Sequence, residues 1–140
     1  MEYNPLKLEN QLCFPLYAAA KEVVKKYTPL LRKIGLTYTQ YITMMALWED
    51  RAANVKALGE KLFLDSGTLT PLLKRLETAG LVERRRGEAD ERNVMVTITD
   101  KGLSLREKAL EIPMELGRCL DMTAADSKTL YVLLYKILRQ

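Results

Sequence analysis

The fold of this chain is decided by one stretch, LDSGTLTPLLKRLETAGLVERRRGEADERNVMVTIT, which runs from Leu64 to Thr99. Its first half repeats leucines at spacings of three and four, which is typical of a helix with one buried face. Gly80 supplies the positive φ expected at a helix C-terminus, and alternating β-branched residues follow on both sides of a turn at 87–90. The stretch therefore predicts a helix followed by a β-hairpin, the two parts of a winged helix whose exposed helix face is suited to DNA. The leucines are Leu69, Leu72, Leu73 and Leu76.

Pro71 leaves two positions open for the start of this helix. Either Asp65 or Ser66 caps it and Pro71 lies inside on an exposed side, or Thr70 caps it and Pro71 is its first residue. An internal proline costs about 3 kcal/mol. We favour the longer helix, because the shorter one leaves too little length to span a DNA groove.

Helical spacing predicts three helices before this stretch. The first begins near Cys13 and runs to Gly35, with Pro15 in its first turn, where a missing N–H costs nothing. Pro29 is expected to kink or split it. The second begins after Thr37 or Thr39 and ends near Asp50, and a short third covers residues 56–63.

Two more helices are predicted after the hairpin. Thr99 or Asp100 caps a fifth helix, which reaches Ile112 and loosens at Pro113 and Gly117. Thr123 opens a sixth helix, rich in leucine. The predicted fold class is mainly α, a winged helix-turn-helix of six helices with a small β-hairpin wing.

Composition excludes several classes of protein. The 140 residues and 48% hydrophobic content fit a single domain. No apolar run is long enough for a membrane span or a secretion signal, so a cytoplasmic protein with no membrane partner is expected. Histidine is absent, only two cysteines occur, and no phosphate-binding loop is found. We therefore expect no enzyme, no metal and no cofactor.

Charge alone is weak evidence for a nucleic-acid partner. The formal net charge is only +4, and between residues 81 and 98 four arginines are balanced by four acidic residues. Bulk attraction to DNA is therefore small in the hairpin. A DNA interface there must depend on the direction in which individual arginines point.

Four motifs together resemble the MarR family of winged-helix regulators, and within it the organic-hydroperoxide-resistance repressors. They are NQLCFPLYAA at 10–19, LTYTQY at 36–41, LDSGTLTPLLKRLE at 64–77, and an Asp-x-Arg hairpin motif at Asp90 and Arg92 followed by VMVTITDKG. The last motif indicates only the broad family. The cysteine block together with LDSGTLTPLLKRLE is far more specific, and the resemblance covers nearly the whole chain.

The resemblance implies a homodimer bound to a pseudo-palindromic operator in double-stranded DNA. Residues 1–35 and 103–140 would form the dimerisation helices, and residues 36–102 the DNA-binding lobe, with its fourth helix in a major groove. Arg92, held by Asp90, would enter the adjacent minor groove. Surface arginines beside glutamates are, alternatively, only solvated charge pairs. The other residues implied in DNA contact are Ser66, Thr68, Thr70 and Lys74 on bases and phosphates, and Arg75, Arg84, Arg85 and Arg86 near phosphates.

Cys13 has two interpretations. Among apolar neighbours a lone cysteine is usually a small buried side chain. The resemblance instead implies a peroxide-sensing thiolate, with an organic hydroperoxide as the inducer. Such a thiolate requires a lowered pKa, for which the sequence offers the dipole of the first helix and hydroxyl donors. By resemblance, Tyr27 and Tyr38 provide these hydroxyls, from within and across the dimer, and Tyr17 is a further neighbour.

Cys119 decides how the oxidised sulfur is resolved. In two-cysteine relatives a C-terminal cysteine closes an intersubunit disulfide, and in one-cysteine relatives a small external thiol takes its place. The resemblance favours Cys119 as the resolving residue. Two further functions stay open at this point: a MarR-type regulator that answers a non-covalent ligand while Cys13 is only packed, and a small thiol peroxidase.

Overall fold

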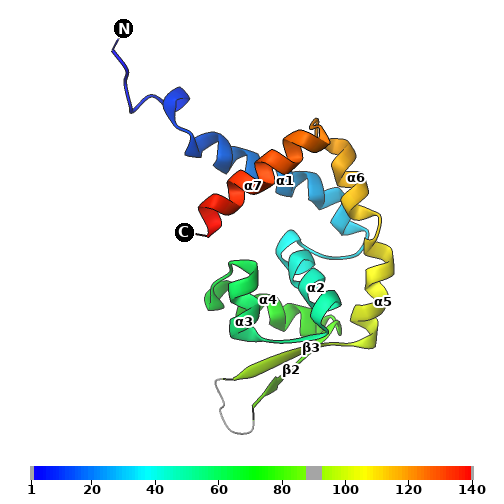
Figure 1. The fold of residues 1–140 in the computed structure, drawn as a ribbon. Helices are drawn as coiled ribbons and strands as arrows, with labels where there is room; N and C mark the ends of the chain where they lie inside the picture. The colour runs from blue at the N-terminus through cyan, green and yellow to red at the C-terminus, as the bar shows by residue number, and fades with distance from the viewer. Residues whose placement is uncertain (1, 88–92, 140) are drawn as a thin grey trace.

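The computed structural model describes residues 2–87 and 93–139, which form a mainly helical chain with one small sheet (Figure 1). A short 3-10 helix at Leu8–Asn10 precedes α1. The elements in chain order are α1 (Cys13–Arg32), α2 (Tyr38–Asp50), β1 (Ala52–Asn54), α3 (Val55–Leu62), α4 (Ser66–Thr78), β2 (Val82–Arg86), β3 (Val94–Ile98), α5 (Asp100–Ala109), α6 (Ile112–Cys119) and α7 (Ala124–Leu138).

The core lies where α2, α3 and α4 meet the sheet. Met44 and Leu47 of α2 are fully buried there, and the leucine face of α4 packs against them together with Val82 and Val96. The hairpin of β2 and β3 projects away from this lobe, and α1, α6 and α7 lie on its opposite side (Figure 1). The winged-helix fold is confirmed.

Side-chain caps fix the helix starts that the sequence predicts. Thr37 and Gln40 form a reciprocal capping box at α2, and Asp65 Oδ1 accepts the Thr68 N–H at 2.7 Å at the start of α4. α4 therefore begins before Pro71, and the longer of the two predicted helices is observed. Gly80 has a φ of +78° and ends it as predicted.

The helices depart from the predictions at two prolines. α1 continues through Pro29 to Arg32 without a split, because the ring is exposed and Leu31 buries the helix end against the lobe. Pro113, expected to loosen the fifth helix, instead lies in the first turn of α6, so the chain after the hairpin holds α5, α6 and α7.

The sheet has one more strand than the predicted hairpin. β1 pairs antiparallel with β3, giving the order β1-β3-β2. Only three residues make this strand, too few to display an alternating pattern. Ala53 lies opposite Val96, and Ile98 donates its N–H to the carbonyl of Arg51 at 2.9 Å.

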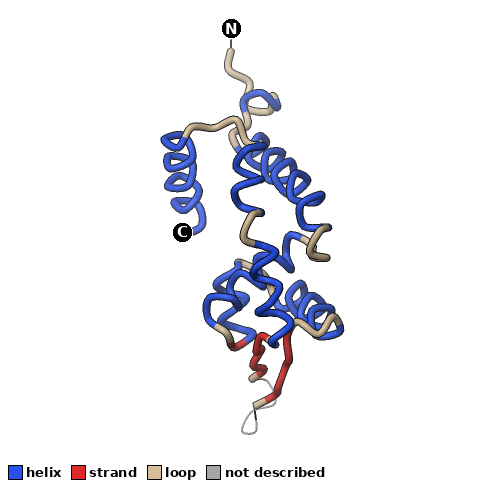
Figure 2. Tube along the Cα trace, turned by 90° about the vertical axis from the view of Figure 1, so that its right-hand side faces the viewer, coloured by secondary structure: helices blue, strands red, loops and turns tan. Residues whose placement is uncertain are grey.

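Two helices keep apolar faces exposed. α7 buries no residue and stands apart from the other helices in Figure 2, and α1 buries only Leu31. An apolar surface of this extent is typical of a protein interface. Along the part of the chain described, no helix is long and apolar enough to cross a membrane. The exposed apolar side chains include Leu12, Phe14, Tyr17, Tyr131, Val132, Leu133 and Ile137.

Candidate functional site

α4 presents a polar face to solvent because its leucines hold the opposite face in the core. Ser66, Thr68, Lys74 and Arg75 are exposed and Thr70 is half-buried. Successive residues are turned by about 100° on a helix, so Lys74 lies near the middle of the exposed face and Arg75 lies on its flank. Hydroxyls, a lysine and an arginine on one helix face supply donors for phosphates and base edges.

The turn before α4 is unusually tight. Leu64 donates its N–H to the Gly59 carbonyl at 3.0 Å, and a Cβ on Gly59 would lie 2.8 Å from the Leu64 carbonyl oxygen. Phe63 closes α3 in the left-handed region, with φ 56° and ψ 37°, although its side chain is 59% exposed. Glycine is the usual residue in this position. No local sequence pattern singles out Phe63 as a strained position.

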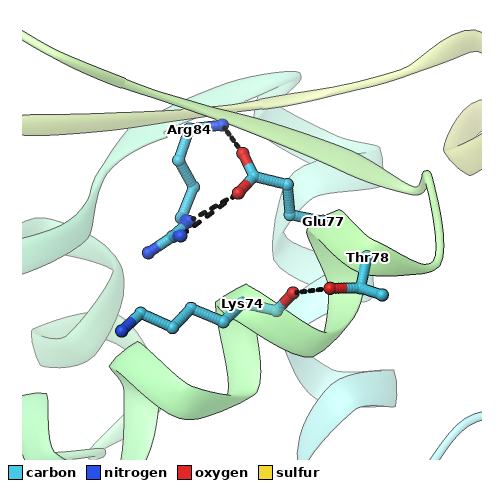
Figure 3. Close-up of polar contacts among 4 residues, drawn as sticks. All are labelled: Lys74, Glu77, Thr78 and Arg84. Carbon is cyan, nitrogen blue, oxygen red and sulfur yellow. Dashed lines mark hydrogen bonds and ion pairs between the residues drawn. The ribbon is translucent and has the colours of Figure 1, made fainter.

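An ion pair joins α4 to the hairpin (Figure 3). Glu77 Oε2 accepts the Arg84 backbone N–H at 2.8 Å, and Oε1 accepts Arg84 Nη2 and Nε at 3.1 and 3.3 Å. Hydrogen bonds from the Arg84 backbone, then from its side chain, lower the pKa of the Glu77 carboxyl. Arg84, predicted to lie near a phosphate, is thus half-buried and engaged within the protein.

The other hairpin arginines are more open. Arg85 Nη2 lies 3.7 Å from Glu83 Oε2 with 84% of its side chain exposed, and Arg86 is also exposed. An ion pair this open contributes little stability. Asp90 and Arg92, the predicted Asp-x-Arg pair, lie outside the described residues.

Cys13 is the first residue of α1 and is exposed. Tyr17 follows one turn later, so both side chains lie on one side of the helix. Its ring, 63% exposed, is covered in part by the Lys21 ammonium at 5.2 Å from the centroid.

Three tyrosines gather between α1 and α2. The ring centroids of Tyr27 and Tyr38 are 4.8 Å apart, and those of Tyr27 and Tyr41 are 5.7 Å apart. Burial, then the neighbouring tyrosines, raises the pKa of Tyr27 to about 12, and burial also raises the pKa of Tyr38. Their hydroxyls therefore stay protonated at neutral pH and act as hydrogen-bond donors.

Cys13 is not brought together with Tyr27 and Tyr38 within one chain. Cys13 and Tyr27 lie on the same helix 14 residues apart, which is about 21 Å along its axis. Tyr38 packs against Tyr27, so both hydroxyls can meet a Cys13 sulfur only across two copies of the chain. The prediction that one of them comes from within the same chain is therefore wrong, because α1 runs unbroken between Cys13 and Tyr27.

Cys119 lies at the opposite end of α1 from Cys13. Its Sγ donates to the Glu115 carbonyl at 3.4 Å, and Glu115 Oε2 lies 3.7 Å from Lys33 Nζ, just past the end of α1. Residues 13 and 33 are 20 positions apart, about 30 Å along the axis of α1, so the two cysteine Cα atoms lie beyond the roughly 7 Å that a disulfide spans. A disulfide between them within one chain is incompatible with this conformation.

Comparison with known proteins agrees with this architecture. The family model described as transcriptional regulator SarA/Rot matches residues 25–109. The organic hydroperoxide resistance transcriptional regulator of Bacillus subtilis is 47% identical over 98% of this chain and 93% of that protein. The chain belongs to the family of SarA/Rot transcriptional regulators. These are winged-helix regulators of the MarR type, so the family that the sequence motifs resemble is confirmed.

Two solved structures of AbfR, a Staphylococcus epidermidis protein, are also similar to this chain. Reduced AbfR bound to DNA has a TM-score of 0.78 with 36% identity, over 94% of this chain and 91% of that one. Disulfide-formed AbfR has a TM-score of 0.70 with 35% identity, over 94% and 90%. The fold is thus shared with a protein that has been solved on DNA in its reduced form and also in a disulfide form.

Glu77 and its contact with Arg84 are what sequence reasoning missed at this site. Both residues stand in the stretch that decides the fold, seven positions apart. The chain reverses between them at Gly80, which brings the helix end and the strand start together. An acidic residue in the last turn of a DNA-facing helix, close to a run of arginines, is the signal that was available.

Proposed function

We propose that this protein is a DNA-binding transcriptional repressor that releases its operator when an organic hydroperoxide oxidises Cys13. The observation that carries the proposal is an exposed thiol at the first residue of α1, in a chain whose α4 presents a polar face for DNA. The relative named as an organic hydroperoxide resistance regulator supports the response to a hydroperoxide. AbfR, solved on DNA and in a disulfide form, supports DNA binding and cysteine oxidation.

Two copies of the chain form the working unit. Residues 1–35 and 103–140 provide the dimerisation helices, which accounts for the exposed apolar faces of α1 and α7. Residues 36–102 form the DNA-binding lobe. A two-fold axis then places two α4 helices in major grooves of a pseudo-palindromic duplex, about one helical turn apart.

Lys74 and the hydroxyls of Ser66, Thr68 and Thr70 contact bases and phosphates from the exposed face of α4. Arg75, Arg85 and Arg86 lie at the rim, near the DNA backbone. Arg92, oriented by Asp90, enters the minor groove beside each half-site. Because the operator is the target, the proposed place of action is the cytoplasm, where bacterial DNA lies.

The sensor is assembled across the dimer. The partner subunit's Tyr27 and the partner subunit's Tyr38 donate hydrogen bonds to the Cys13 sulfur, which lies in the first turn of α1. The thiolate attacks one peroxide oxygen, the O–O bond breaks, and the alkoxide leaves and takes a proton from water. Cys13 becomes a sulfenic acid and the hydroperoxide is reduced to an alcohol. Tyr17 and Phe14 offer apolar surface to the organic substituent.

The sulfenic acid is then resolved by a thiol. Attack by the partner subunit's Cys119 forms an intersubunit disulfide and releases water, whereas a small external thiol forms a mixed disulfide. Either product changes packing between the subunits and so the spacing of the two α4 helices, which ends repression. No metal or cofactor enters this chemistry, and each oxidation switches one site rather than turning over peroxide as an enzyme does.

The test uses full-length reduced protein and a duplex that it selects from a random library. Affinity is measured before and after cumene hydroperoxide, and again after dithiothreitol. We expect loss of binding on oxidation and recovery on reduction. Selection of no sequence, or an affinity unaffected by the hydroperoxide, would overturn the proposal.

A further inference from the structure

The hairpin leaves the lobe at Arg84. Val82, at the start of β2, is 1% exposed and packs beneath α4, whereas Arg85 and Arg86 are exposed. On the other side of the hairpin, Asn54 at the end of β1 donates its side-chain amide to the Asn93 side chain. The hairpin is therefore held from two sides, by β1 at the end of the ladder near the turn and by α4 at Arg84, midway along β2.

Glu77 constrains Arg84 more than a simple charge pair would. A single carboxylate accepts three hydrogen bonds, of which one comes from the backbone of β2 and two from the guanidinium. Charge-assisted bonds from a planar guanidinium fix orientation as well as distance. The backbone bond ties the strand itself, and not only a flexible side chain, to the last turn of α4.

The contact leaves Lys74 and Arg84, the two cations near the end of α4, in different states of charge pairing. Arg84 has its charge balanced by Glu77, while Lys74, one turn earlier on α4, makes no ion pair among the described residues (Figure 3). In Figure 3 the Arg84 side chain runs from β2 toward α4, whereas the Lys74 side chain extends along α4. Lys74 therefore has its charge available for a phosphate, and the charge of Arg84 is paired with Glu77.

We infer that Glu77 and Arg84 are positioning residues whose ion pair sets the angle between the hairpin and α4. This angle fixes where the hairpin meets the neighbouring groove when α4 lies in the major groove. This inference rests on the proposed DNA-binding function. It replaces the phosphate contact predicted for Arg84 with a role exerted through the hairpin.

The direction in which Glu77→Gln changes DNA affinity distinguishes this positioning role from simple electrostatic attraction. Glu77→Gln removes a negative charge beside the DNA-facing helix, so attraction to phosphates alone makes binding tighter. Loss of the ion pair frees the hairpin, so the positioning role makes specific binding weaker. Arg84→Gln distinguishes the two roles again, because loss of a phosphate contact reduces the slope of log affinity against log salt by about 1.

The experiment compares Glu77→Gln, Arg84→Gln, the double variant and Glu60→Gln in the full-length reduced protein. Glu60 is an exposed acidic residue on α3 with no ion pair among the described residues, so Glu60→Gln makes the same charge change without breaking the contact. Affinity is measured from 50 to 200 mM salt on the duplex selected by the wild type and on a scrambled duplex. Hydrogen exchange at the Arg84 amide, without DNA, reports on the contact itself, and thermal unfolding verifies folding.

We expect Glu77→Gln and Arg84→Gln each to weaken specific binding by about tenfold. The double variant should bind no more weakly than either single variant, and the salt slope of Arg84→Gln should equal that of the wild type. The Arg84 amide exchanges faster in Glu77→Gln, and Glu60→Gln binds as tightly as the wild type or tighter. Any one of three results would overturn the inference. Glu77→Gln could bind at least as tightly as Glu60→Gln, the Arg84 amide could exchange at an unchanged rate in Glu77→Gln, or Arg84→Gln could lower the salt slope. A wild type that selects no duplex would instead overturn the proposed function, while the exchange result still tests the contact.

Discussion

The ring centroids of Tyr27 and Tyr38 lie 4.8 Å apart, which joins the second half of α1 to the first turn of α2. Tyr41 and Trp48 extend this aromatic contact along α2 toward the hairpin lobe, and the Trp48 indole donates to the Gly102 carbonyl of α5 at 2.8 Å. The hydroxyls proposed to meet the sensor sulfur thus belong to side chains packed against the DNA-binding lobe.

Tyr27 is predicted to make stability fall at alkaline pH. Its pKa is 10.0 in the unfolded chain and about 12 in the fold, so between these values the unfolded state has lost more protons. The free energy of unfolding therefore falls as pH rises from about 10 to 12, and the contribution of Tyr27 is constant below that window. Urea unfolding of wild type and Tyr27→Phe at pH 8 and pH 11 measures the difference. A difference that is the same at both pH values would contradict the prediction.

Gly102 is predicted to tolerate no side chain. A Cβ there would meet the Leu81 carbonyl oxygen and lie 2.7 Å from Ile98 Cγ1, at the contact between α5 and the sheet. Gly102→Ala should lower the free energy of unfolding by about 1 to 3 kcal/mol. Gly117→Ala is the matched control, since no atom lies within 4 Å and alanine favours the helix by up to about 1 kcal/mol. Equal effects of the two substitutions on urea unfolding would refute this packing argument.

Phe63 is predicted to lower stability through its backbone. With φ at 56°, an L side chain is strained, and Phe63→Gly should raise the free energy of unfolding by about 1 kcal/mol. Phe63→Ala removes the exposed ring but keeps the Cβ, so it should show no such gain. If both variants gain equally in denaturant unfolding, the effect comes from the ring and not from the backbone.

Cys119 is predicted to act between subunits. Because the structure keeps Cys13 and Cys119 of one chain apart, hydroperoxide should produce a species of twice the chain mass on non-reducing electrophoresis, absent in Cys119→Ser. A disulfide found within a single chain, or a cross-linked dimer that persists in Cys119→Ser, would contradict this assignment. A mixed disulfide formed with added thiol in the wild type would indicate the external-thiol route.

Local signals in the sequence were enough for most of the fold. Asp65 and Thr37 identify helix starts because a cap needs only a few neighbouring residues, and Gly80 marks a helix end for the same reason. β1 depends on pairing with β3, a distant segment brought alongside by the fold, which no short pattern reveals. The Glu77–Arg84 contact had a local signal, an acidic residue near a run of arginines, but it forms only because the chain reverses at Gly80. Pro113 was misjudged because a proline that ends one helix also suits the first turn of the next.

The site was predicted unevenly for the same reason. The exposed face of α4 follows from helical periodicity, and Lys74 lies on it as expected. Cys13 at the start of α1 follows from the placement of Pro15 in a first turn. The separation of Cys13 from Tyr27, by contrast, becomes clear only once α1 is seen to run unbroken between them.

The central claim is that Cys13 controls DNA release, and its most direct test is the affinity of Cys13→Ser for the selected duplex with and without cumene hydroperoxide. The account predicts that reduced Cys13→Ser binds as the wild type does and that the hydroperoxide leaves its affinity unchanged, while the wild type dissociates. Release of Cys13→Ser by the hydroperoxide to the same extent as the wild type would contradict the account.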